Sequence, residues 1–124
     1  MTKAYQELET YLETAQALQT ALTLFEWDNE TLAPKEAGAY TGKMIGALSG
    51  EYFRIMTDEK GKALIKACKE ETDLSEVETA IVREVEKEQK RLDCIPADEY
   101  REFAELTSES ARIWAKARKE KDFK

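Results

Sequence analysis

Three carboxylates, Glu26, Asp28 and Glu30, lie within one short stretch and are the strongest candidates for acid–base chemistry in this sequence. The chain contains no histidine, which excludes a histidine general base, a histidine metal ligand and any Ser-His-Asp or Cys-His arrangement. Paired acids can still do acid–base work if burial raises the pKa of one of them. The competing interpretation is structural: Asp28 hydrogen-bonds a turn, and Glu26 and Glu30 are solvated.

The stretch from Phe25 to Pro34 is predicted to be the first break between helices. Pro34 suits the first turn of a following helix, where its missing N–H costs nothing. Asp28, Asn29 and Thr31 have side chains that can cap backbone groups at such a corner. Trp27 is expected to anchor the corner in the core.

Apolar residues at steps of three and four predict an all-α fold for a single domain covering residues 1–124, with about five helices in antiparallel hairpins resembling a helical bundle. The first helix is expected over 4–25 and the second over 34–56, and a short third follows Thr57 or Asp58. Ser75 and Glu78 form a capping box for the fourth. Pro96 opens the last helix, whose predicted inner face comprises Tyr100, Phe103, Ala104, Thr107, Ala111, Trp114 and Ala115.

Glycines recur at every fourth position of the second predicted helix: Gly38, Gly42, Gly46 and Gly50. Each costs a helix interior about 1 kcal/mol relative to alanine. Four in register therefore indicate a ridge where another backbone approaches closely. Tight packing within the chain and a face between two copies of the chain both fit this pattern.

The net charge is -7 and the pI is about 4.8. This balance argues against nucleic acid and against anionic membrane surfaces as partners. No run approaches the roughly 18 apolar residues of a membrane span. Acids stand near the start where a signal peptide would have its apolar region, so the cytoplasm is the expected location. The two cysteines, Cys68 and Cys94, are expected to be reduced thiols.

Three landmarks resemble the carboxypeptidase Taq family of metallocarboxypeptidases. The segment Leu24–Pro34 is similar to the family's early Trp-Asp-x-x-Thr-x-x-Pro segment, through Trp27, Asp28, Thr31 and Pro34. Residues 95–100, which include Pro96, resemble its Ile-Pro helix start. The stretch from Trp114 to Arg118, followed by Asp122 and Phe123, resembles the next landmark. The order and spacing agree over essentially the whole chain, which matches only the N-terminal part of a family whose members are several times longer.

The resemblance implies a noncatalytic helical segment of a metal-dependent carboxypeptidase, an enzyme that releases C-terminal amino acids from peptides. Zinc, or another divalent metal, is implied for the full-length relative and no metal or other cofactor for this chain, because nothing here matches the family's HExxH motif. Thr41 stands where the family usually has an arginine, and Met44 where it commonly has a polar residue. The implied partner is the rest of the peptidase chain, or a second copy in a homodimer.

Two predictions separate this interpretation from its alternatives. A segment of a longer enzyme should expose apolar surface where the remainder docks, with Phe123 and part of the glycine ridge expected to take part. A stand-alone helical protein-interaction module should instead have a covered core and one groove for a partner helix. A small enzyme using the carboxylates of Glu26, Asp28 and Glu30 is the third possibility.

Overall fold

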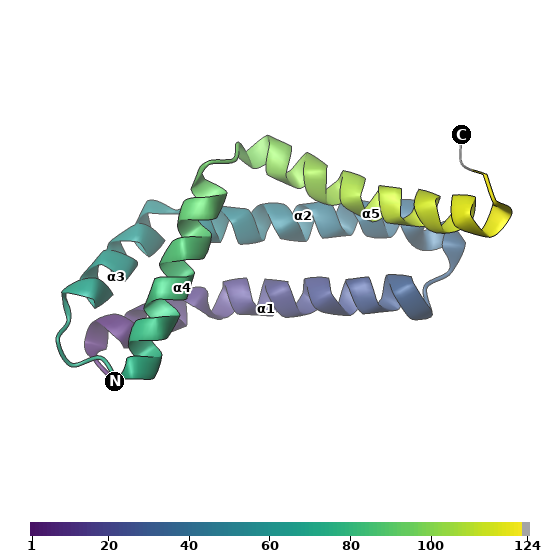
Figure 1. Ribbon diagram of the computed structural model, residues 1–124. Helices are drawn as coiled ribbons and strands as arrows, with labels where there is room; N and C mark the ends of the chain where they lie inside the picture. Colours follow the sequence, from purple (N-terminus) through teal and green to yellow (C-terminus); the bar gives the residue numbers. More distant parts are fainter. Residues whose placement is uncertain (123–124) are drawn as a thin grey trace.

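The protein is all-α in the computed structural model, which describes residues 1–122 (Figure 1). The prediction of about five helices is confirmed. In chain order the described elements are α1 (Lys3–Thr31), the 3₁₀ turn η1 (Lys35–Ala37), α2 (Gly38–Thr57), α3 (Glu59–Glu70), α4 (Glu76–Asp93) and α5 (Ala97–Glu120).

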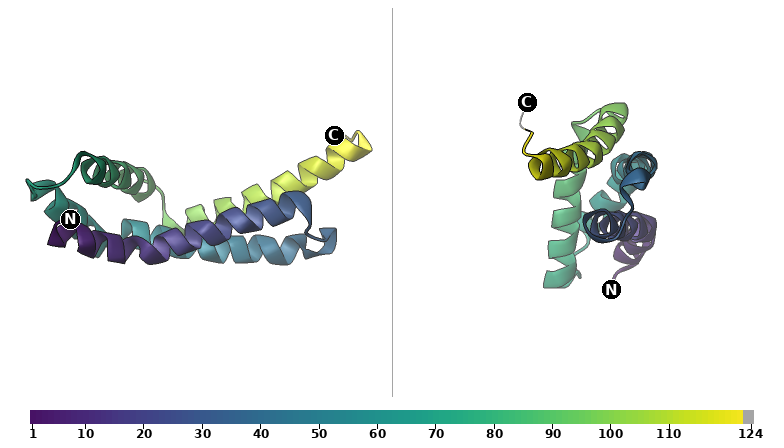
Figure 2. Two further views of the ribbon diagram at one scale, coloured as in Figure 1. Left: turned by 90° about the horizontal axis from the view of Figure 1, so that it is seen from below. Right: turned by 90° about the vertical axis from the view of Figure 1, so that its right-hand side faces the viewer.

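Helix α2 is the centre of the arrangement, because it contacts each of the other four α-helices. It forms an antiparallel hairpin with α1 and lies between α1 and α5 in Figure 1. Helices α3 and α4 gather at the end that holds the N-terminus, where α4 runs steeply across the α1–α2 hairpin. Figure 2 shows α5 extending along α2 toward the opposite end of the molecule.

The hydrophobic core occupies the end where α3 and α4 lie. Its side chains come from the first half of α1, the second half of α2, α3 and α4: Tyr5, Leu8, Leu12, Ala15, Phe53, Ile55, Met56, Ile65, Cys68, Val82 and Leu92. Tyr100 at the start of α5 packs against Phe53, with ring centroids 4.9 Å apart. Beyond that contact, α5 has no buried residue within the described chain. The hydrophobic core therefore occupies one end of the molecule, while toward the other end α1 and α5 are mostly exposed and α2 keeps buried residues between them.

The capping box predicted for α4 is confirmed. The Ser75 hydroxyl accepts a hydrogen bond from the Glu78 N–H (3.2 Å), and a Glu78 carboxylate oxygen accepts one from the Ser75 N–H (2.8 Å). This pairing fixes where α4 begins.

The predicted break at residues 25–34 is wrong in its position. Helix α1 continues through Trp27 and Asp28 to Thr31. Backbone groups close this turn: the Asp28 carbonyl accepts from the N–H groups of Leu32 (3.0 Å) and Ala33 (2.9 Å). The Thr31 hydroxyl donates to the Trp27 carbonyl (2.6 Å). These are ordinary helix-end contacts, and the polar side chains of this stretch do not interrupt the helix.

Pro96 is the cap residue directly before α5, as predicted, whereas η1 separates Pro34 from the helix that it was predicted to open. Pro34 is extended (φ -60°, ψ 142°) and precedes η1, so that α2 begins only at Gly38. Pro96 is also extended (φ -60°, ψ 140°) and is the residue before α5. The carbonyl of each proline accepts a hydrogen bond from the turn that follows, from Ala37 and from Tyr100 respectively (both 3.0 Å).

Candidate interaction surface

The four glycines of α2 lie against α5, which runs antiparallel to α2 at this contact. Each glycine faces a polar side chain of α5, in the pairs Gly38–Arg112, Gly42–Ser108, Gly46–Glu105 and Gly50–Arg101. A Cβ atom at Gly38 would lie 2.6 Å from the Arg112 Cδ, and one at Gly46 would overlap the Glu105 side chain. Close packing within the chain, one of the two interpretations of the row, is thus the arrangement that the structure shows.

The face of α5 that meets α2 is polar, and its apolar residues are directed elsewhere. Phe103, Leu106, Ile113 and Trp114 lie within one broad stripe of the helix at 3.6 residues per turn. Their exposed fractions are 68%, 59%, 52% and 62%. We call these four residues the outer stripe of α5. An amphipathic helix normally turns such a stripe toward a core, so this one lacks its cover within the described chain.

The predicted inner face of α5 is therefore wrong for five of its seven residues, which are exposed: Phe103, Thr107, Ala111, Trp114 and Ala115. The period of the apolar residues identifies an apolar face correctly, but it does not identify the neighbour that covers this face. Here α2 offers glycines, and the long polar side chains Arg101, Glu105 and Arg112 lie across them. Trp114 is left in contact with the Arg118 guanidinium, 5.3 Å from the ring centroid.

A second group of exposed apolar residues surrounds the α1–α2 corner. Leu24, Trp27 and Leu32 are 63%, 58% and 73% exposed, and Tyr40 at the start of α2 is 68% exposed. We call these four residues the corner patch. The prediction that Trp27 anchors the corner in the core is wrong, because its helical position places it on the outer side of α1. Phe123, predicted to join the exposed surface, lies outside the described residues.

The structure does not bring the three candidate carboxylates together. Glu26 and Glu30 are one helical turn apart on an exposed face of α1. Asp28, two residues from each, points to another side of the same helix. Among residues 1–122 no three acids, cysteines or histidines are grouped closely enough to hold a metal ion. Nothing in this part of the chain supports acid–base catalysis by these carboxylates.

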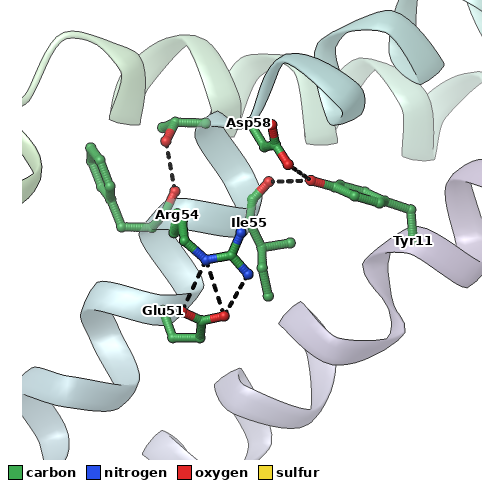
Figure 3. A network of polar contacts seen from close by, with 7 residues as sticks. Tyr11, Glu51, Arg54, Ile55 and Asp58 are labelled. Atoms are coloured by element: carbon green, nitrogen blue, oxygen red, sulfur yellow. Dashed lines mark hydrogen bonds and ion pairs between the residues drawn. The ribbon is translucent and has the colours of Figure 1, made fainter.

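The polar cluster where α1, α2 and α3 meet is structural (Figure 3). The Tyr11 hydroxyl lies 3.1 Å from the Ile55 carbonyl and 3.0 Å from an Asp58 carboxylate oxygen. Burial, together with the bond to Asp58, raises the pKa of Tyr11, so the phenol stays a donor. The hydrogen bond from Tyr11, together with the Lys60 N–H, lowers the pKa of Asp58.

This link between helices is a contact that the sequence did not reveal. Asp58 is recognisable from the sequence as a helix cap, and it does accept from the Lys60 N–H (3.5 Å). Tyr11 is not part of the regular apolar spacing of α1, and nothing in the sequence around it indicates a partner far along the chain. Beside the cluster is an open hollow of about 720 Å³ lined by side chains of both charges, which gives it no clear preference for a charged ligand.

Within the described residues, none of the helices has the length and apolar character needed to cross a lipid bilayer. The thiols of Cys68 and Cys94 are both free, and Cys68 is fully buried. Burial raises the pKa of the Cys68 thiol, which keeps it protonated and unreactive.

Comparison with known proteins gives the open faces a context. The model of the carboxypeptidase Taq (M32) metallopeptidase family matches residues 7–124. Carboxypeptidase 1 of Bacillus subtilis (strain 168) is 36% identical over 104 residues, which are 83% of this chain and 21% of that protein. A solved structure, "BsuCP Crystal Structure", superposes with a TM-score of 0.93 at 32% identity, over 98% of this chain and 25% of the other.

The chain thus spans about a fifth of the length of the curated relative that it matches. The described part of the matched region consists of helices joined by short connections, and it includes the glycine ridge, the corner and α5. By sequence and by fold, the chain belongs to the carboxypeptidase Taq (M32) family of metallopeptidases.

Proposed function

We propose that this chain is a noncatalytic helical segment of a metal-dependent carboxypeptidase and that it acts as a scaffold for the catalytic remainder of the enzyme. The enzyme as a whole would release C-terminal amino acids from peptides, as the family description and the name of the curated relative suggest. The cytoplasm is the proposed location, which the two free thiols support.

The observation that carries the proposal is the outer stripe of α5. Four large apolar side chains, each more than half exposed, line one side of a helix that has no buried residue within the described chain. Exposed apolar surface of this kind marks an interaction site. The rest of the peptidase chain is the partner that we propose for this surface, because about four-fifths of the curated relative's length lies outside the matched region.

The metal of such an enzyme would need ligands from that remainder. Metallopeptidases of this general kind use a bound metal to activate water or polarise a carbonyl. The chain has no histidine, and its described acids and cysteines form no group of three that fits a metal ion. Zinc, the metal that the resemblance suggests, is thus proposed for the whole enzyme, and its site is proposed to lie elsewhere.

A chimera tests the proposal. The matched segment of Carboxypeptidase 1 would be replaced by this chain, and release of C-terminal amino acids from peptides would be measured with zinc present. We expect an active chimera, because a scaffold needs only the right fold and the right docking face. A folded, metal-loaded chimera without activity would contradict the proposal.

Variants of the chimera locate the docking face. Phe103→Glu with Trp114→Glu should lower both the activity and the melting temperature, because two charges would be buried against the remainder. Arg83→Glu is the matched control: it changes the net charge by the same two units on an exposed face of α4. If the double variant behaves like the control, the outer stripe is not the docking face. A chain that works as a stand-alone interaction module would leave the chimera inactive.

A further inference from the structure

The second half of α1 has an exposed face without charges. Residues 14–25 contain no charged side chain, in a chain in which 36% of the residues are charged. More than half of these twelve residues are nevertheless exposed, and only Ala15 among them is buried. The water-exposed face of a helix normally carries charged side chains. This face of α1 therefore has the composition of a covered surface, although nothing in residues 1–122 covers it.

The spacing on this face is that of a helix-packing seam. Residues at alternating steps of three and four fall on one side of α1: Ala17, Thr20, Leu24, Trp27 and Thr31. We call these five residues the α1 seam, which shares Leu24 and Trp27 with the corner patch. All five are exposed, Leu24 by 63% and Trp27 by 58%. Helix α1 thus has two packing faces, one toward the core and one that lacks cover within the described chain.

The threonines of the α1 seam do not require a polar partner. The Thr20 hydroxyl donates to the Gln16 carbonyl (2.9 Å), and the Thr31 hydroxyl donates to the Trp27 carbonyl (2.6 Å). A hydroxyl that is bonded back to its own helix leaves the methyl group for contact with a neighbour. The seam therefore offers methyl groups, a leucine and an indole ring, which suit close packing against another helix.

We propose that the α1 seam is a second docking site for the remainder of the peptidase chain, covered there by a helix with an uncharged face. The inference rests on the proposed function, because the remainder is the partner only if the chain is a segment of a longer enzyme. About four-fifths of the curated relative's length lies outside the matched region, which is ample for a covering helix. The seam is distinct from the outer stripe, since α2 lies between α1 and α5 (Figure 1).

The charges of α1 argue against a second copy of this helix as the partner. Glu9 and Glu13 continue the side of the seam toward the N-terminus. After Lys3, α1 contains no lysine or arginine, so the seam of a second α1 offers these acids no basic partner. Each copy also carries a net charge of -7, and like charges repel. A different helix, from the remainder, avoids both penalties.

The test measures how fast a thiol on the seam is alkylated, in the isolated chain and in the chimera with Carboxypeptidase 1. Thr20→Cys places the thiol on the seam. Thr79→Cys is the matched control, because Thr79 is an exposed threonine of α4. Both variants also carry Cys94→Ser, since the Cys94 thiol is exposed and would react. Peptide mass spectrometry follows alkylation by iodoacetamide at each site separately.

We expect the thiol of Thr20→Cys to react about tenfold more slowly in the chimera than in the isolated chain, because a covering helix excludes the reagent. The thiol of Thr79→Cys should react at similar rates in both proteins. Equal rates for Thr20→Cys in the two proteins would overturn the inference. Slow alkylation of the isolated chain that becomes faster on dilution would show that a second copy covers the seam, and would overturn the choice of partner.

A charge placed on the seam gives a second readout. Thr20→Glu should lower the melting temperature of the chimera, because a carboxylate would be buried against an uncharged face. It should leave the melting temperature of the isolated chain nearly unchanged, as should the control Thr79→Glu in both proteins. A drop of equal size in the isolated chain and the chimera would mean that the seam is already packed, and would contradict the inference.

The two proposals fail in different ways. A folded, inactive chimera in which Thr20→Cys is protected would contradict the scaffold function and support the docking site. An active chimera in which Thr20→Cys reacts as fast as in the isolated chain would support the scaffold function and overturn the docking site.

Discussion

Gly46 of α2 and Glu105 of α5 face each other so closely that a methyl group at Gly46 would overlap the Glu105 carboxylate. Gly42, one turn away, has room: a Cβ atom there would lie 3.8 Å from the Ser108 hydroxyl, an ordinary contact. The glycine row therefore contains one position where a side chain would displace Glu105 and one that tolerates a side chain.

Alanine at these two positions should have different effects. Gly42→Ala should raise the free energy of unfolding by up to about 1 kcal/mol, the gain in helix propensity. Gly46→Ala should raise the free energy of unfolding by less, or lower it, because Glu105 must move and its ion pair with Arg101 (3.3 Å) is disturbed. Urea unfolding followed by circular dichroism measures both. Equal stabilisation by the two variants would show that α5 does not hold its position on α2.

The exposure of the outer stripe can be checked with a matched pair of phenylalanines. Phe53 is 5% exposed in the core and Phe103 is 68% exposed on α5. In the isolated chain, Phe53→Ala should cost about 3–5 kcal/mol of stability. Phe103→Ala should change it by no more than about 0.5 kcal/mol. Urea unfolding measures both changes. A large loss of stability in Phe103→Ala would mean that the outer stripe is already covered in the isolated chain.

The isolated chain should self-associate as its concentration rises. The outer stripe and the corner patch leave large apolar side chains in water, and burying them between two copies is favourable. Light scattering after size-exclusion chromatography should show a concentration-dependent mass, and the double variant Phe103→Glu with Trp114→Glu should remain monomeric. A natural chain that stays monomeric at high concentration would count against an unpartnered apolar face.

Asp58 should make the stability depend on pH in the acid range. Its hydrogen bonds favour the charged form, so its pKa in the folded chain lies below the ordinary value of 3.8. The stabilisation is therefore present above about pH 4 and is lost as the pH falls through the lowered value. Asp58→Asn keeps an acceptor for Tyr11 and does not titrate.

The comparison between the natural chain and Asp58→Asn isolates this effect from other acids. Glu51, Glu78 and Glu86 also have pKa values lowered by their hydrogen-bond partners, so acid should weaken both chains. As the pH is lowered from about 5 through the lowered pKa of Asp58, the natural chain should lose more stability than Asp58→Asn, as measured by thermal unfolding. If the stability of the two chains depended on pH in the same way, Asp58 would not contribute to the pH dependence.

Local features of the fold were predictable from local sequence. The capping box of Ser75 and Glu78 and the regular spacing of the glycines each depend on residues within one or two helical turns, which short-range physics governs. The position where α1 ends could also have been predicted from the sequence. Ala33 is pushed out of the helical region by Pro34, and this constraint outweighs the polar side chains of Asp28 and Thr31.

The partner of each helix face was not predictable in the same way. The period of apolar residues in α5 shows that Phe103 and Trp114 lie on the same side of the helix. It does not show that α2 packs against the opposite side. The Tyr11–Asp58 contact likewise joins residues far apart in the sequence. Such contacts follow from the register between helices, which the pattern of a single helix does not contain.

The central claim is that the outer stripe of α5 is covered by further residues of the same polypeptide. The most direct test is the mass of the natural product in its source cells, measured by immunoblot with an antibody raised against this chain. Because the chain covers 21% of the curated relative, we expect a band at about five times its mass of 14.2 kDa. A single band at 14.2 kDa would contradict the claim and would leave the stripe as a surface for a separate partner.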